Sequence, residues 1–232
     1  MSDVDLPGLT EFAFERLLRP LVGSGGGEAR ISVTPAEVSD GGGGLLVVSL
    51  AGEGEVAACL DGLVSISASA QIRRLSPRSR GARVEGGLSR LVGVCGEGCA
   101  VISPRGQTFE VFRLRRDLCY LRESMVWALA GGLEVDVGLL PGSRQAGLEG
   151  VSMLRLAGDG TAAVRTPGAV IAVPVRPESP QRVAGDALVG WIGGIGGVTA
   201  VAEPAEGLVR CEGEGTVLVA VGPWRPPGGG AA

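Results

Sequence analysis

Two groups of arginines are the residues of this chain best suited to bind a ligand. The guanidinium group forms paired hydrogen bonds with phosphate and carboxylate, so neighbouring arginines are typical of anion sites. The alternative is a solvated surface that keeps an otherwise apolar chain soluble. The candidate anion-binding residues are Arg73, Arg74, Arg78, Arg113, Arg115 and Arg116.

Composition argues against several kinds of catalytic site. All 21 basic residues are arginine, because the chain has neither lysine nor histidine. This excludes Ser-His and Cys-His pairs, imidazole metal ligands, Schiff bases and the phosphate-loop lysine. A net charge of −4 and an aromatic content of 3% provide no basic or stacking surface for nucleic acid. We therefore expect a non-catalytic protein with no cofactor, no metal and no nucleic-acid partner.

Acidic residues and cysteines are the remaining candidate ligands. Four acids that lie between glycines would hold Ca²⁺ only if they met along one rim, and Ca²⁺ takes 6–8 oxygens, so we interpret them as solvated turn residues. Cys95 and Cys99 bracket one of these turns, where a disulfide is conceivable, but buried inert thiols are the preferred interpretation. The four acids are Glu53, Glu97, Asp159 and Glu214, and further carboxylates for an enzyme are Glu85, Glu123, Glu134 and Asp136.

A Gly-acid-Gly motif occurs four times and indicates an internal repeat. An offset of 62 residues carries Gly96, Gly106 and Gly131 onto Gly158, Gly168 and Gly193, whereas the first unit follows an offset of 44. Glycines that flank one acid suit a tight turn between strands, because glycine accepts positive φ. The predicted turn glycines are Gly52, Gly54, Gly96, Gly98, Gly158, Gly160, Gly213 and Gly215.

Short apolar runs of period two predict that most of the chain is β-structure. Residues 133–139 alternate apolar and polar side chains, which is typical of a half-buried strand. Trp127 and Trp191 lie at near-equivalent places of two repeat units and are interpreted as core or interface anchors. Residues 8–21 are the one convincing helix, which we expect either to cover an open sheet edge or to contact a neighbouring subunit.

The predicted organisation has three parts. The N-terminal helix and a glycine-rich joint precede a duplicated β domain, which is followed by a disordered tail. The boundaries are 1–27 for the helix and joint, 28–222 for the β domain and 223–232 for the tail. Within the β domain we expect repeats at about 45–87, 88–149 and 150–206, with closing strands at 207–222.

Cysteine usage and the N-terminal sequence predict a cytoplasmic protein. Five cysteines are an odd number, and the acidic start lacks the basic and apolar segments of a signal peptide. The longest uncharged run, Ala187–Ala202, is too short for a membrane span and contains five glycines. We expect no transmembrane segment, and peripheral association with a membrane stays open.

Three segments resemble one protein family. Residues 121–135, 154–162 and 207–219 are similar to the strand pairs of the mitochondrial biogenesis family, which is named after altered inheritance of mitochondria. That family is built from domains like the tryptophan RNA-binding attenuator protein. The resemblance covers about 45–222 and implies all-β, duplicated jelly-roll-like units of the double-stranded β-helix type. It also implies a homo-oligomer, with a trimer favoured, and provides no catalytic residues.

These observations support three hypotheses for the function. The leading one is a non-catalytic, oligomeric β protein of uncharacterised role that acts as a scaffold or binding module. The alternative is a binder of a small ligand, with its pocket between β units or subunits. The second alternative is an enzyme that uses paired carboxylates.

Overall fold

A computed structural model describes seven segments of the chain, and nearly all of their residues lie in antiparallel strands. The all-β fold class is therefore confirmed, whereas the jelly-roll arrangement and the attenuator-like units stay predictions. Among the described residues, no helix has the length and apolar character needed to cross a membrane. The described segments are 15–16, 29–34, 44–52, 54–75, 87–140, 151–201 and 207–222.

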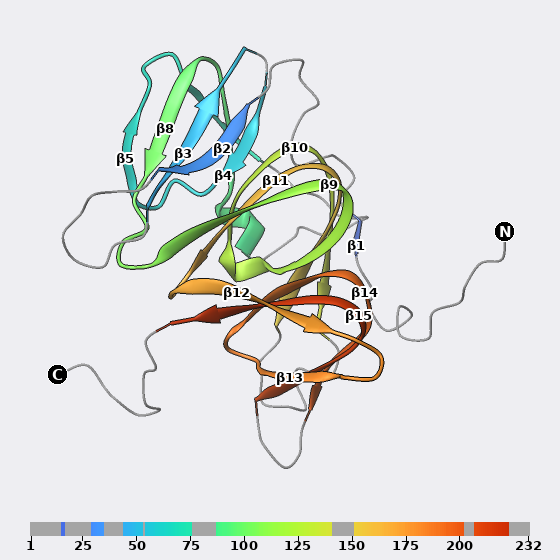
Figure 1. Ribbon diagram of the computed structural model, residues 1–232. Coiled ribbons are helices and arrows are strands. Elements are labelled where there is room, and N and C mark those ends of the chain that lie inside the picture. Colours follow the sequence, from blue (N-terminus) through green and yellow to red (C-terminus); the bar gives the residue numbers. More distant parts are fainter. Residues whose placement is uncertain are drawn as a thin grey trace, which may run out of the picture.

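Two sheets make up the described structure, and Figure 1 shows the smaller one at one end of the molecule. It contains β2 (Arg30–Thr34), β3 (Leu45–Leu50), β5 (Leu63–Ile66) and β8 (Gly98–Ile102). The larger sheet contains β1 (Glu15–Arg16), β4 (Val56–Ala58), β6 (Gln71–Arg74), β7 (Val92–Cys95), β9 (Thr108–Arg122), β10 (Val126–Leu139), β11 (Ser152–Thr166), β12 (Ala169–Val175), β13 (Gln181–Ala184), β14 (Leu188–Val201) and β15 (Leu208–Val221). Two 3₁₀ turns, η2 (Gly87–Arg90) and η3 (Glu123–Met125), complete the described elements.

The larger sheet has the strand order β12-β15-β14-β9-β11-β10-β4-β7-β6, and the smaller has β2-β3-β8-β5. The chain alternates between them, because β3, β5 and β8 belong to the smaller sheet while β4, β6, β7 and β9 belong to the larger. The long strands β9, β10 and β11 arch through the middle of the molecule, and β12–β15 form its other end (Figure 1).

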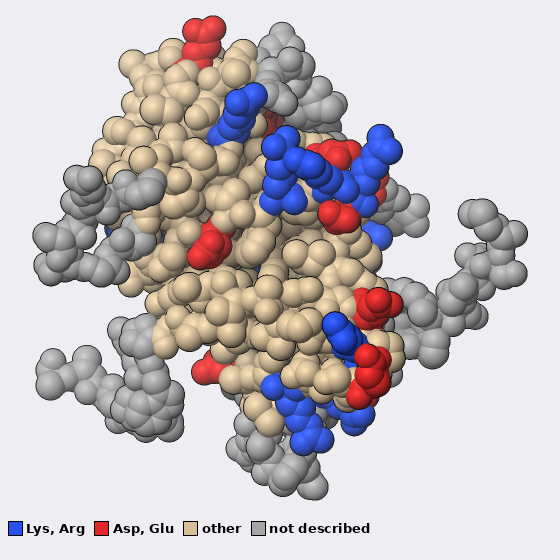
Figure 2. Space-filling model, viewed as in Figure 1, with Lys and Arg blue, Asp and Glu red and all other residues tan. Residues whose placement is uncertain are grey.

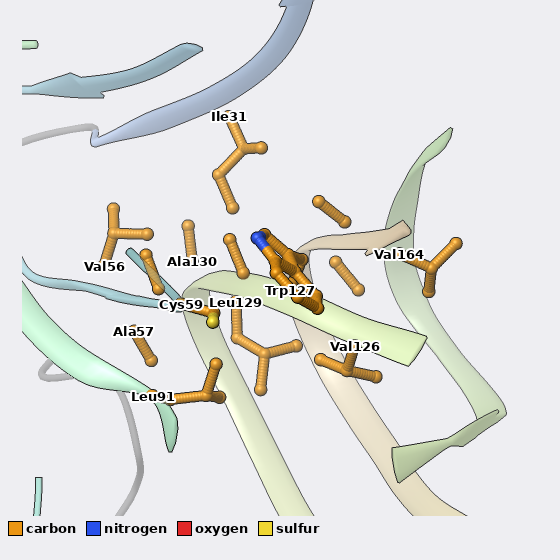
Figure 3. Packing of buried hydrophobic residues seen from close by; sticks show 14 of the residues in the cluster. Ile31, Val56, Ala57, Cys59, Leu91, Val126, Trp127, Leu129, Ala130 and Val164 are labelled. Carbon is orange, nitrogen blue, oxygen red and sulfur yellow. The ribbon is translucent and has the colours of Figure 1, made fainter. Parts of the chain in front are cut away.

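The main core fills the space between the two sheets. Strand β3 alternates buried and partly exposed residues, with Leu46 and Val48 fully buried against the larger sheet. Trp127 of β10 is 3% exposed, and Figure 3 shows it among Ile31 and Leu129. A second cluster surrounds Trp191, which is 1% exposed, so both tryptophans are core residues.

The Gly-acid-Gly motifs do not all form turns. Gly52 lies in a turn after β3, and Gly96 lies in the short turn between β7 and β8. The prediction is wrong for Gly158, Gly160, Gly213 and Gly215, which lie inside β11 and β15. Gly158 and Gly213 have φ of 110° and 112°, a conformation that bends a strand without ending it.

Close approach of backbone explains the second glycine of each of these two motifs. Gly160 lies opposite Gly131, and Gly215 lies opposite Gly193, in the ladders with β10 and β14. A Cβ on Gly160 would lie 2.5 Å from the Ala130 carbonyl oxygen, which is closer than van der Waals contact allows. Glycine is therefore needed where two bent, paired strands approach closely, and not only where the chain reverses.

The predicted N-terminal helix is wrong where it can be checked. Residues 8–21 lie outside the described segments except for Glu15 and Arg16, which form the short strand β1. They pair with Val137 and Asp136 of β10, beyond the end of β4. The open edge of β10 is thus covered by extended backbone, whose hydrogen bonds a helix cannot supply.

The predicted offset of 62 residues relates the bounds of some strands but not of others. Adding 62 carries β10 (Val126–Leu139) onto the bounds of β14 (Leu188–Val201). The same offset carries the continuous strand β9 onto the region of two separate strands, β12 and β13. Pro177 and Pro180 lie in the interruption, where proline lacks the N–H that a ladder needs. The repeat as a whole, and the proposed unit boundaries, stay predictions.

Candidate functional site

A pocket of about 490 Å³ lies where β2 of the smaller sheet crosses the face of β9, β11 and β10. This volume is within the range of about 300–1,000 Å³ that is common for small-molecule sites. The pocket has an apolar floor and a rim that carries three arginines. Its lining residues are Ala29, Arg30, Ile31, Val111, Arg113, Leu114, Arg115, Ala130, Gly131, Asp159, Gly160 and Thr161.

Ladder register explains how three strands present their side chains to this pocket. Arg113 of β9 is opposite Thr161 of β11, which is opposite Ala130 of β10. Two residues further along β9, Arg115 is opposite Asp159. Because side chains of a strand alternate between faces, Arg113 and Arg115 point to the same side, with their Cα atoms about 7 Å apart.

The two pocket arginines of β9 form no ion pair with another described residue. Arg113 and Arg115 are exposed, and neither forms an ion pair with any residue in the described segments. Figure 2 shows charged side chains of both signs gathered over the bend of β9 and β11. Two guanidinium groups that have no ion-pair partner among the described residues, beside a hollow, are a suitable receptor for an anion.

Arg116 has a different role because it is the extra residue of a β-bulge. The register skips it between Asp117 and Arg115, and its φ is 56°. Its Nε lies 3.8 Å from Asp159 Oδ2, and both side chains are largely exposed. Such a pair adds little stability in water, yet it places a positive charge beside the acid of the pocket rim.

The floor of the pocket consists of buried apolar residues. Ile31 is 8% exposed and Ala130 is 2%. Trp127 packs in the same cluster, and Figure 3 shows its indole nitrogen on the side of the ring turned toward Ile31. The pocket therefore ends at the main core, with Ile31 between it and the indole ring.

Sequence reasoning identified only part of this site. Arg113 and Arg115 line the pocket as candidate anion contacts, whereas Arg116 is the bulge residue beside it. Arg73 and Arg74 lie on the exposed edge strand β6, and Arg78 lies outside the described residues. Arg30 was missed, because nothing in the local sequence indicates that β2 crosses β9.

Two arginines pack against the ring of Trp127. The guanidinium carbons of Arg165 and Arg90 lie 3.5 and 4.5 Å from the centre of its ring system. Arg90 Nη2 donates to the carbonyl oxygens of Ser124 and Val126, while Arg165 pairs with Asp61 at 3.6 Å. Burial lowers the pKa of both arginines, so each contact compensates a desolvated charge.

Two of the acids considered for catalysis or metal binding accept hydrogen bonds that stabilise the fold. Asp136 Oδ2 accepts a hydrogen bond from Arg155 at 2.8 Å, and Glu123 Oε1 accepts one from the Leu88 amide at 3.0 Å. Glu134 is exposed and Glu85 lies outside the described residues. Within the described segments, no three His, Cys, Asp or Glu side chains gather as metal ligands do. Glu97, Asp159 and Glu214 are exposed, and Glu53 is outside the description.

All five cysteines are free thiols. Cys95 is buried and Cys99 partly buried, on the two sides of the turn between β7 and β8. Burial, with a contribution from Asp117, raises the pKa of Cys119 from about 9 to about 12, and burial raises that of Cys211 to about 12. Both thiols therefore stay protonated at neutral pH and are poor nucleophiles.

These two thiols predict a loss of stability at alkaline pH. Their folded pKa lies above the unfolded value, so their stabilising effect is complete below about pH 8.5 and is lost between pH 9 and 12. At pH 10 the two together lower the free energy of unfolding by about 2–3 kcal/mol. Urea denaturation at pH 8 and 10 measures this loss, which the double variant Cys119→Ala, Cys211→Ala should largely remove. Equal losses in both proteins would contradict it.

Comparison with known proteins places the chain in a family. The family described as Mitochondrial biogenesis AIM24 matches residues 37–223. The crystal structure of protein SPYM3_0169 from Streptococcus pyogenes has a similar fold, with a TM-score of 0.63, 14% sequence identity, and coverage of 84% of this chain and 94% of that chain. Among curated proteins, none matches this chain. The family match includes the three segments that suggested the resemblance, and the chain therefore belongs to the Mitochondrial biogenesis AIM24 family.

Proposed function

We propose that this protein is a non-catalytic binding module whose ligand occupies the pocket between β2 and the β9-β11-β10 face. The observation that supports this is the combination of a hollow of about 490 Å³ with two rim arginines, Arg113 and Arg115, that form no ion pair among the described residues. Small-molecule sites combine apolar surface with a few polar groups that fix orientation, and this pocket combines apolar residues at its floor with arginines at its rim. The reduced, cytoplasmic compartment indicated by the free cysteines is part of the same proposal.

A thermal-shift screen of the full chain tests the proposal. The panel contains small acidic, neutral and basic metabolites of similar size. A compound at 100 times its Kd stabilises a protein by about 2.7 kcal/mol, which raises the melting temperature by several degrees. We expect at least one compound to do this, and the double variant Arg113→Gln, Arg115→Gln to lose the effect if that compound is acidic.

The matched control is Arg73→Gln, Arg74→Gln on the edge strand β6. It also removes two positive charges, but from exposed positions outside the pocket lining, so ligand stabilisation should be unchanged. The proposal is wrong if no compound stabilises the protein. It is also wrong if crosslinking or chemical-shift mapping places the hits away from β2, β9 and β11.

We also propose that the protein is a homo-oligomer, with three subunits as the expected number, and that β12 contacts the neighbouring subunit. The two ends of the larger sheet differ: β6 carries Arg73 and Arg74, whereas β12 contains no charged residue. Ile171 of β12 is 48% exposed, and the nearby Val221 is 52% exposed. Figure 2 shows a broad uncharged surface over β12. Charge on an edge strand discourages pairing, and β12 lacks it.

Light scattering after size-exclusion chromatography tests this second proposal. We expect a trimer at micromolar concentration and a monomer for Ile171→Lys. The control Ile72→Lys adds a charge to the other edge at a residue that is 53% exposed, and its mass should be that of the unmodified protein. A monomeric unmodified chain, or equal masses for both variants, would refute the role of β12.

A further inference from the structure

We infer that the pocket takes a phosphate monoester with a short apolar group. This inference rests on the proposed binding function and adds the chemical class of the ligand. It follows from two features of the pocket, which are the charge at its rim and the apolar character of its floor.

The charge at the rim matches a phosphate monoester. Arg113 and Arg115 supply two positive charges that are free of ion pairs among the described residues. Asp159 also lines the pocket, and Arg116 in the bulge adds a further positive charge 3.8 Å from its carboxylate. A phosphate monoester carries about −1.5 to −2 charge at pH 7, so it neutralises the two arginines where one carboxylate would neutralise one.

The geometry of the rim also suits three acceptor oxygens. Arg113 and Arg115 point from the same face of β9 with Cα atoms about 7 Å apart, which lets two forked guanidinium groups approach one tetrahedral group. Thr161 stands opposite Arg113 in the next strand and offers a hydroxyl donor. Arg30 lines the pocket from β2, on the other sheet.

The floor requires an apolar group joined to the phosphate. Ile31, Val111 and Ala130 line it, and the cavity of about 490 Å³ is far larger than a phosphate group alone needs. Each buried CH₂ group of a ligand raises its affinity about fourfold. The apolar group is short because the floor ends at Ile31, with the Trp127 cluster behind it.

Isothermal titration calorimetry on the full chain tests the inference with hexyl phosphate, inorganic phosphate, hexanol and hexanoate as probes. We expect hexyl phosphate to bind at least about 30-fold more tightly than inorganic phosphate. Hexanoate should bind more weakly than hexyl phosphate, and hexanol should not bind measurably. Each of Arg113→Gln and Arg115→Gln should weaken hexyl phosphate at least about 10-fold, whereas Arg73→Gln should not.

The apolar half of the inference has its own variant. Val111→Thr replaces one methyl group of a floor residue with a hydroxyl group. It keeps the shape of the side chain and its preference for a strand. We expect it to lower the ratio of hexyl phosphate to inorganic phosphate affinity about threefold while inorganic phosphate binds as before. An unchanged ratio would overturn the assignment of the floor to the ligand's apolar group.

Two sources of the same chemistry are distinguished by a vesicle assay. Cosedimentation with phosphatidic acid vesicles, lost in Arg113→Gln and absent with phosphatidylcholine vesicles, would identify a lipid headgroup as the source of the phosphate and would overturn the short apolar group. Binding of hexyl phosphate without vesicle binding would identify a soluble monoester. If neither probe binds but the metabolite screen gives a neutral or basic ligand in the pocket, this inference fails and the binding function stands. If the screen also gives nothing, both fail.

Discussion

Replacing Trp127 with alanine is expected to lower the free energy of unfolding by about 3–5 kcal/mol. Total stabilities of 5–15 kcal/mol are usual, so this is a large fraction. The indole ring is 3% exposed between the two sheets, and its removal leaves a cavity. It also leaves the guanidinium groups of Arg90 and Arg165 without the ring that covers them.

The matched variant Trp127→Phe distinguishes loss of the whole aromatic ring from exchange of the indole for a smaller ring. Phenylalanine keeps an aromatic face for both arginines, so we expect a smaller loss, of about 1–2 kcal/mol. Urea denaturation followed by circular dichroism measures both variants. A loss below about 1 kcal/mol for Trp127→Ala would show that the space between the sheets collapses freely, contrary to a core built around this ring.

Replacing Gly190 with valine is expected to cost about 3 kcal/mol or more, because there is no space for a side chain. A Cβ at this position would lie 1.9 Å from the Tyr120 carbonyl oxygen, which belongs to backbone and moves only with its strand. Gly190 pairs with Leu121 in the short ladder between β14 and β9. This ladder joins β12, β14 and β15 to the rest of the larger sheet.

Near-ultraviolet circular dichroism provides a local signal for this variant. Tyr120 stacks on Trp191 at 4.6 Å between ring centres, in the same ladder as Gly190. Gly190→Val should weaken that signal as well as lower the urea midpoint. Gly132→Val is the control, because a Cβ there would meet only the Asp159 carbonyl oxygen, at 3.7 Å. Equal losses in the two variants would contradict a steric cause.

The sequence predicts well where strands lie. It predicts poorly where those strands bend. The alternation at 133–139 identifies part of β10, and Leu133 and Val135 are buried as predicted. Further along, the predicted pattern of burial is wrong, because Asp136 is 8% exposed and Leu139 is 47% exposed. The glycine motifs look alike in sequence, yet Gly96 lies in a turn and Gly158 in a strand. Positive φ is common to both, and only the pairing of the flanking residues decides whether the chain reverses.

The candidate site was predictable only as far as its residues are neighbours in sequence. Arg113 and Arg115 alternate with an apolar residue on one strand, so their shared face follows from the period of a strand. Arg30 and Ile31 reach the pocket from a strand about eighty residues earlier, through the packing of one sheet on the other. No local pattern encodes such a crossing, and the same is true of the arginines that pack against Trp127.

The alternation of successive strands between the two sheets has a kinetic consequence. Strand β4 lies between β10 and β7, and β8 lies between β3 and β5, so each sheet is incomplete until segments distant in sequence have met. Closing such loops costs entropy before the contacts can compensate, which makes chains of this topology slow to fold. Refolding of this protein should accordingly proceed on a timescale of about milliseconds to seconds, with neither sheet acquiring protected amides before the other.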